Sequence, residues 1–188
     1  MVAGYSMAAD TIRYMHYTGD SQWATTGNWS NQTTKLLMTN QLGTNDIARI
    51  NKGSQGTPGA LCQLFISTEV ANVAVAVDEP GQLYMEGTES TPITLNAIGN
   101  SYNALGWNSR GTFTLTNYAN FYATSSITIG RQGWWTNVTP IQVQSNKNVS
   151  CWASVGANCT LATTNNFIFN NQDQPYHVTN FGYSYFKA

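Results

Sequence analysis

Short segments in which apolar and polar residues alternate recur along most of the chain, and polar turns separate them. A period of two is typical of β-strands that bury one face, and residues 11–17 show it clearly. Residues 70–77 carry Val and Ala on both faces, which predicts a central strand covered on both sides. Helical spacing is almost absent: residues 44–51 fit either one helical turn with Thr44 as its N-cap or another strand. The pattern therefore predicts an all-β protein with almost no helix.

The connections between these segments predict how the strands pair. Pro80-Gly81 has the chemistry of a type II turn and predicts a hairpin between residues 70–77 and 82–86. About ten or eleven such strands, joined by polar turns, favour an antiparallel sandwich or barrel. The expected strands further along the chain include residues 91–98, 111–118, 121–129 and 141–144. We find no linker, composition shift or repeat. We therefore expect residues 1–188 to form a single-domain antiparallel β-sandwich, with a jelly-roll among the topologies that fit.

The surface is expected to be polar but almost uncharged. Charged residues make up 9% of the chain, against about 25% in an average domain. The aromatic share of 12% argues against disorder, and no apolar run is long enough to predict a transmembrane segment. A net charge of −1 without any basic cluster excludes nucleic-acid binding through phosphates. Neutral surfaces rich in Asn, Thr, Ser and Gln are typical of secreted proteins, lectins and viral or phage attachment proteins.

The first ten residues have neither the cationic nor the apolar region of a signal peptide. We still expect a secreted or extracellular-facing protein, whose leader is absent or removed. Cys151 and Cys159 are close enough in sequence to close a short loop through a disulfide, which would fit an oxidising compartment. The alternative is that these two residues and Cys62 are buried thiols. No Cys or His spacing indicates zinc, and no cofactor is expected.

No catalytic motif stands out. Four of the nine carboxylates, those of Asp78, Glu79, Glu86 and Glu89, fall in two pairs near opposite ends of the expected hairpin. Glycoside hydrolysis needs two carboxylates about 5–10 Å apart across one bond. The chain has two histidines, and it has no nucleophile elbow and no phosphate-binding loop. We therefore expect that this protein is not an enzyme.

The aromatic residues are the strongest functional signal, because many of them stand among Thr, Gly and Asn. Trp134 and Trp135 follow a turn, and neighbouring residues of a strand point to opposite faces, so one of the two rings is expected to be exposed. The alternative for each ring is a core position, since large aromatics are usually at least partly buried. The expected ligand-binding residues are Trp23, Trp29, Trp107, Asn108, Tyr118, Tyr122, Trp134, Trp135 and Asn137, with Asp20 as a further hydroxyl-binding group.

Exposed aromatic rings suit three kinds of function. A sugar ring stacks its C–H groups on them while Asn and Asp bind its hydroxyls, which favours a lectin-like, non-catalytic, carbohydrate-binding module for a neutral glycan. Weak sites of this kind gain from multivalency, so a homo-oligomer is expected. The first alternative is a membrane-surface, lipid-binding protein that recognises a zwitterionic head group such as phosphocholine through cation–π contacts. The second is a viral or phage attachment or structural β-domain.

The Trp134-Trp135 pair at the start of an expected strand carries a family resemblance. Residues 133–138, in a β-protein of this size, resemble the actinoporins and the fungal lectins that share their fold. The resemblance implies an actinoporin-like β-sandwich in which aromatics around this strand contact lipid head groups or sugars, as in a toxin. The chain lacks the clear N-terminal amphipathic helix and the basic residues expected of a pore former.

Overall fold

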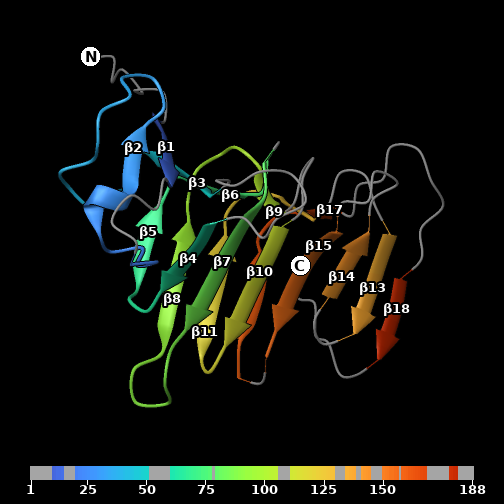
Figure 1. Cartoon of the computed structure of the whole chain (residues 1–188). Coiled ribbons are helices and arrows are strands. Elements are labelled where there is room, and N and C mark those ends of the chain that lie inside the picture. Colours follow the sequence, from blue (N-terminus) through green and yellow to red (C-terminus); the bar gives the residue numbers. More distant parts are fainter. Residues whose placement is uncertain are drawn as a thin grey trace, which may run out of the picture.

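The computed structural model consists almost entirely of β-strands, arranged in three sheets that wind around a common core (Figure 1). The one helical element among the described residues is a single 3-10 turn, η1 (Thr26–Asn28). The near absence of helix is therefore confirmed for this part of the chain. The structure describes residues 10–14, 20–50, 60–77, 79–105, 111–129, 134–138, 141–144, 150–156, 158–168 and 178–181.

The strands fall into three sheets, which we name A, B and C. Sheet A has the order β17 (Phe167–Ile168), β12 (Ile127–Ile129), β9 (Asn103–Leu105), β6 (Asn72–Val75), β3 (Asp46–Ile50), β1 (Asp10–Tyr14), β2 (Trp29–Asn31). Sheet B has the order β18 (Val178–Phe181), β13 (Trp134–Val138), β14 (Ile141–Gln144), β15 (Ser150–Val155), β10 (Gly111–Thr116), β7 (Gly81–Glu86), β4 (Ala60–Leu64). Sheet C has the order β16 (Thr160–Thr163), β11 (Ala119–Ala123), β8 (Ile93–Ala97), β5 (Thr68–Val70).

The chain visits the three sheets in turn, so each circuit forms one coil of a parallel β-solenoid. β3, β4 and β5 form one coil, β6, β7 and β8 the next, and β9, β10 and β11 the third. Strands of successive coils pair in parallel, and the antiparallel exceptions among the described strands are β1–β2, β13–β14 and β14–β15. The expectation of an antiparallel β-sandwich, whether jelly-roll or actinoporin-like, is therefore wrong.

The antiparallel prediction failed because the alternation of apolar and polar residues does not depend on strand direction. A period of two records that one face of a strand is buried, and it does not record the direction of the neighbouring strand. Parallel sheets are usually covered on both faces and lack alternation. In a solenoid, three sheets enclose one core, so a parallel strand can bury one face and leave the other in water. It then alternates as an antiparallel strand does, as in β7, β8 and β11.

The coils differ in length, which hides the repeat. Leu64, Met85, Leu115 and Val155 occupy equivalent positions in successive strands of sheet B, and they lie 21, 30 and 40 residues apart in sequence. The longest interval contains the β13–β14 hairpin, which pairs beside β15 and extends sheet B beyond the coils, at the right of Figure 1. β18 then pairs in parallel with β13.

The hairpin predicted around Pro80-Gly81 is also wrong. Residues 70–77 are not one strand, because β5 ends at Val70 and β6 begins at Asn72, in a different sheet. Gly81 begins β7 in sheet B, so the turn carries the chain round a corner of the solenoid instead of folding it back. β6 is nevertheless a central strand, flanked by β3 and β9.

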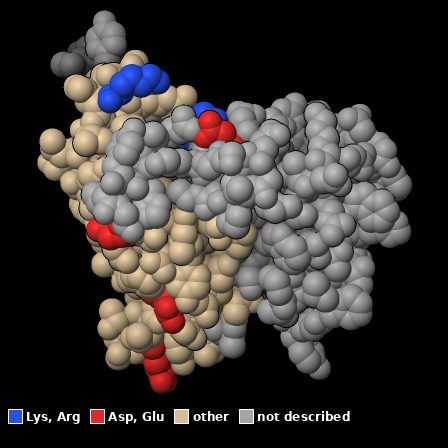
Figure 2. Space-filling model, in the orientation of Figure 1, with Lys and Arg blue, Asp and Glu red and all other residues tan. Residues whose placement is uncertain are grey.

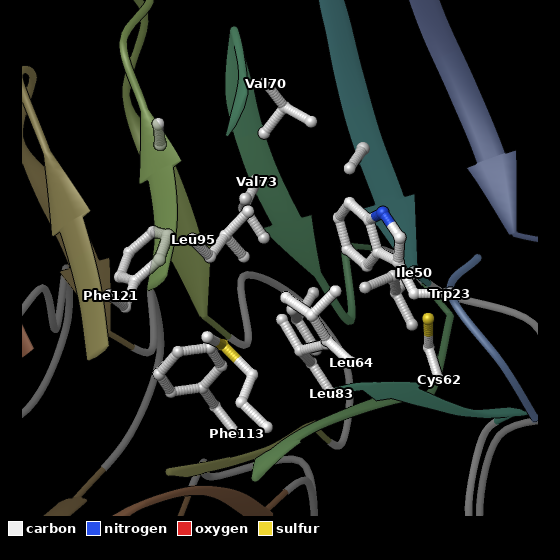
Figure 3. Packing of buried hydrophobic residues seen from close by; sticks show 14 of the residues in the cluster. Trp23, Ile50, Cys62, Leu64, Val70, Val73, Leu83, Leu95, Phe113 and Phe121 are labelled. Carbon is white, nitrogen blue, oxygen red and sulfur yellow. The ribbon is translucent and has the colours of Figure 1, made fainter. Parts of the chain in front are cut away.

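The core is a stack of apolar side chains that repeats from coil to coil (Figure 3). Cys62, Leu83 and Phe113 hold one register position of sheet B, and all three are buried. The Phe113 ring meets that of Phe121, from sheet C, edge to face at 5.5 Å between centroids. Parallel coils also place like side chains above one another, so the apolar residues pack both within a coil, as Phe113 and Phe121 do, and against the coils on either side.

The corner between sheets C and A contains buried amides instead of apolar residues. The Asn103 side chain is fully buried, accepts a hydrogen bond from the Val73 backbone N–H (2.8 Å) and donates one to the Ser125 hydroxyl (3.1 Å). In the preceding coil, the Asn72 side chain donates to the Ser101 carbonyl (2.6 Å). These bonds replace the water that the corner backbone would otherwise need.

An N-terminal cap, which we define as residues 20–42 together with β1, lies at the first-coil end of the core. The backbones of Ser21 and Trp23 form hydrogen bonds with the backbone of Gln63, which lies in β4. β1 and β2 extend sheet A. Trp23 and Trp29 are buried, with 1% and 0% exposure, and their rings stand edge to face at 4.8 Å. The expected exposure of Trp23 and Trp29 is therefore wrong. Terminal coils of a solenoid must cover an apolar end, and here large rings do so.

Candidate functional site

The outer face of sheet C carries a regular array of outward side chains. Leu95, Phe121 and Leu161 point into the core, so the alternate positions of their strands point outward. We name this surface the sheet-C face. Its eight outward residues on β8, β11 and β16, or directly after β11 and β16, are Thr94, Asn96, Asn120, Tyr122, Thr124, Thr160, Ala162 and Thr164, and the exposed Glu69 of β5 and Ile98 after β8 border them.

The parallel register aligns these side chains in rows across the coils. One row is Thr94, Asn120 and Thr160, and the next is Glu69, Asn96, Tyr122 and Ala162. Adjacent strands lie about 4.8 Å apart, so residues in one row are near neighbours although about 26 to 40 positions separate them in sequence. The rows depend on the winding of the chain, and sequence periodicity alone does not reveal them.

Tyr122 stands in the middle of the sheet-C face. Its side chain is 42% exposed, and its strand β11 lies between β8 and β16. Tyr118 precedes β11, is half-buried and has a φ of 63°, a left-handed conformation that costs free energy for a bulky residue. Asn117 beside it also has a positive φ, of 48°. The two residues turn the chain sharply from sheet B into sheet C.

The polar groups of the sheet-C face are only partly used by the protein. The Thr164 hydroxyl donates to the Thr124 carbonyl (3.0 Å), and the Asn120 amide donates to the Ile93 carbonyl (3.4 Å). Each keeps acceptor capacity. Within the described part of the chain, the side chains of Asn96 and Thr160 have no hydrogen-bond partner. The face therefore offers both donors and acceptors to a ligand.

Charge is scarce on this surface, and charged side chains are also few among the described residues on the side of the molecule that Figure 2 shows. None of the eight outward residues of the sheet-C face is ionisable at neutral pH. The nearest charge in the register is Glu69, in the same row as Tyr122 and two strands away. A single carboxylate cannot supply the acid and base pair of a glycosidase.

A second aromatic group lies on the outer face of sheet B, and it is engaged within the protein. Tyr84 donates its hydroxyl to Glu86 (2.8 Å), and the Asn117 amide donates to the same carboxylate (2.6 Å). Burial and the hydrogen bond to Glu86 raise the pKa of Tyr84. The ring of Phe65 meets that of Tyr84 edge to face at 6.3 Å. This group ties β7 to the corner before β11, so its polar atoms are occupied.

The structure brings together two of the expected ligand-binding residues, Tyr118 and Tyr122, at β11. Trp23 and Trp29 lie in the cap core, where the Trp29 indole N–H donates to the Trp23 carbonyl (2.8 Å). Asp20 is exposed, but its carboxylate accepts hydrogen bonds from Thr25 and Asn28 and so holds the cap loop.

The other expected residues fall where side chains are not described. Trp107 and Asn108 lie outside the described residues. Trp134, Trp135 and Asn137 are placed by their backbone alone, in β13, where Trp135 pairs with Val143 and Val178. Their proposed ligand contacts stay predictions.

The cysteines give no further site. Cys62 is buried, and burial raises the pKa of its thiol well above the usual value. Cys159 is half-buried just before β16. Cys151 lies in β15, and its side chain is outside the described set, so the Cys151–Cys159 disulfide stays a prediction.

The described residues contain neither a metal-binding cluster nor a membrane-spanning helix. No group of three or more His, Cys, Asp or Glu side chains in this part of the chain could hold a metal ion. Among the same residues, no helix has the length and apolar character needed to cross a membrane.

Sequence reasoning chose Tyr122 and missed the other seven outward residues of the sheet-C face. The segments 93–97 and 119–123 do share an alternation of inward apolar with outward residues, but this alternation does not record which strands pair. Comparisons with protein-family models, with curated proteins and with solved structures found no match. The class of the protein is therefore given by its fold, a parallel β-solenoid, and its function must be argued from the surface.

Proposed function

We propose that this protein is a non-catalytic module that binds a neutral glycan on the sheet-C face, as a secreted or extracellular-facing protein. The observation that carries the proposal is Tyr122, an exposed aromatic ring at the centre of an uncharged surface of amides and hydroxyls. A tyrosine ring accepts the C–H face of a sugar, and side chains such as Asn96 and Thr160 are available to its hydroxyl groups.

The rigidity of the sheet supports this role. Phe121 and Leu161, on the opposite side of β11 and β16, are buried in the core, so the outward side chains stand on fixed backbone. Sites on rigid strands keep their geometry and lose little entropy when a ligand binds.

The lipid head-group alternative has weaker support. It depended on a large set of exposed aromatic rings, and Trp23 and Trp29 are in the cap core. A choline cage also needs several rings around one cation. On the sheet-C face Tyr122 is the one aromatic among the eight outward residues.

Affinity electrophoresis tests the proposal. The protein is run through native gels containing one neutral polysaccharide each: galactan, β-glucan, mannan, xylan or dextran. We expect at least one of them to retard the wild type, and Tyr122→Ala to weaken that retardation at least about tenfold, equivalent to about 1.4 kcal/mol. The matched control is Tyr84→Ala, which removes an outward tyrosine from a central strand of sheet B.

Three results would contradict the proposal. Unretarded migration of wild type in every gel, together with binding to phosphatidylcholine vesicles, would favour the lipid alternative. Binding to neither would remove the basis for a ligand on this face. Equal losses in Tyr122→Ala and Tyr84→Ala would mean that the ligand does not depend on the sheet-C face.

A further inference from the structure

The position beside Tyr122 on the neighbouring strand of the sheet-C face carries a small side chain, and we name this position the notch. It is held by Ala162, which is paired in register with Tyr122 and is the smallest of the eight outward residues. On the other side of Tyr122 stands Asn96, whose side chain is longer. In the register, Tyr122 therefore has an amide side chain on one side and a single methyl group on the other.

Two hydroxyl groups flank this notch on β16. Thr160 and Thr164 lie two positions before and after Ala162, so each is about 6–7 Å from it along the strand. The Thr164 hydroxyl donates to the Thr124 carbonyl and keeps its acceptor lone pairs. The Thr160 hydroxyl has no partner among the described residues, so it can donate as well as accept.

We propose that the notch formed by Tyr122, Ala162, Thr160 and Thr164 is a subsite for a single neutral pyranose residue. The C–H face of the sugar packs against the Tyr122 ring, its edge rests on Ala162, and its hydroxyls meet Thr160 and Thr164. This inference rests on the proposed function and adds where one sugar unit sits and what chemistry it has.

The lack of positive charge around the notch favours a neutral sugar over an acidic one. The eight outward residues of the face include no Lys or Arg that could balance a carboxylate, and Glu69 lies in the same row as Ala162. The carboxylate of a uronic acid would therefore lose part of its hydration without gaining a cationic side chain as a partner. The subsite is expected to select neutral hexopyranoses over uronates of the same ring geometry.

Filling the notch tests the subsite. Ala162→Leu places a larger apolar side chain where the sugar would lie, and it points outward, so folding should be retained. The matched control is Ala74→Leu, an alanine at an outward position of the central strand β6 in sheet A. We expect Ala162→Leu to weaken retardation at least about tenfold in the gel that retards wild type, and Ala74→Leu to leave it unchanged.

Thr160→Val provides a second variant that changes no internal hydrogen bond, and we expect it to weaken binding several-fold. Galactose, glucose or mannose, whichever is the monomer of the bound polysaccharide, should compete, while its uronate should not. If Tyr122→Ala loses binding but Ala162→Leu and Thr160→Val bind as wild type, the subsite is wrong and the proposed function stands. If wild type binds none of the polysaccharides, the proposed function fails and the subsite with it.

Discussion

The N-terminal cap and the sheet-C face both carry aromatic rings among Asn, Thr and small residues, yet they treat those rings in opposite ways. In the cap, Trp23 and Trp29 are buried and pack edge to face. On the sheet-C face, Tyr122 is 42% exposed on a strand whose other face is core. A polar sequence context therefore does not decide whether an aromatic ring meets solvent.

The difference follows from what each region must cover. A solenoid has apolar core exposed at its ends, and bulky rings from a loop can cover that area with few residues. The middle coils have no such need, because their neighbours above and below complete the core. Outward residues there are left to solvent and can serve binding.

The largest expected effect separates the two regions by stability. Trp29→Ala removes a fully buried ring and the indole N–H that donates to Trp23. We expect it to lower the free energy of unfolding by about 3–5 kcal/mol. Tyr122→Ala, in contrast, should change it by less than about 1 kcal/mol, because the side chain is 42% exposed and lies outside the core. Urea unfolding monitored by circular dichroism measures both, and equal losses would break the comparison.

An intermediate effect on the free energy of unfolding is expected when a buried corner amide, Asn103, is removed, and little effect when an outward amide, Asn96, is removed. Asn103→Ala leaves the Val73 backbone N–H without its buried acceptor. We expect a loss of about 1–3 kcal/mol. Asn96→Ala, on the sheet-C face, is the matched control and should be close to neutral in stability. If Asn103→Ala is equally neutral in urea unfolding, the polar corner does not stabilise the coils.

The smallest effect at neutral pH concerns Tyr14, whose ring contacts Trp29 at 5.0 Å between centroids. Burial, with the nearby Cys62 and Asp20, raises the pKa of this phenol in the folded protein. The raised pKa contributes stability that is fully present below the unfolded pKa of about 10 and is lost as the pH rises through the folded value. Tyr14→Phe should therefore flatten the loss of stability above about pH 10.

Thermal melts at a series of alkaline pH values measure this effect, with Thr94→Ala, a substitution outside the core, as the control. A melting midpoint that falls as steeply with pH in Tyr14→Phe as in wild type would show that the cap phenol does not govern alkaline stability.

Much of the strand content could be read from the sequence. The expected strands at residues 91–98, 111–118 and 141–144 correspond to β8, β10 and β14, since each alternates over a few residues between turns. The expected segment 121–129 contains a corner, because it spans the end of β11 and all of β12. Corners were missed where no Gly or Pro marks them, as at Ala71 between β5 and β6.

The candidate site was only partly predictable. Tyr118 and Tyr122 were chosen for their aromatic character; Tyr122 does face outward on β11, whereas Tyr118 lies in the turn before this strand. Ala162 and Thr160 could not be chosen, because their relation to Tyr122 and Asn120 is a register across 40 residues that includes the inserted β13–β14 hairpin.

The sequence by itself determined the strand character, the low charge and the apolar side of each strand, because these are local properties of composition and period. Only the tertiary structure decided that the strands run parallel in coils, that Trp23 and Trp29 close one end, and that Tyr122 faces solvent beside Ala162. The direction of a neighbouring strand and the burial of a ring depend on residues far away in the chain, and alternation carries no information about them.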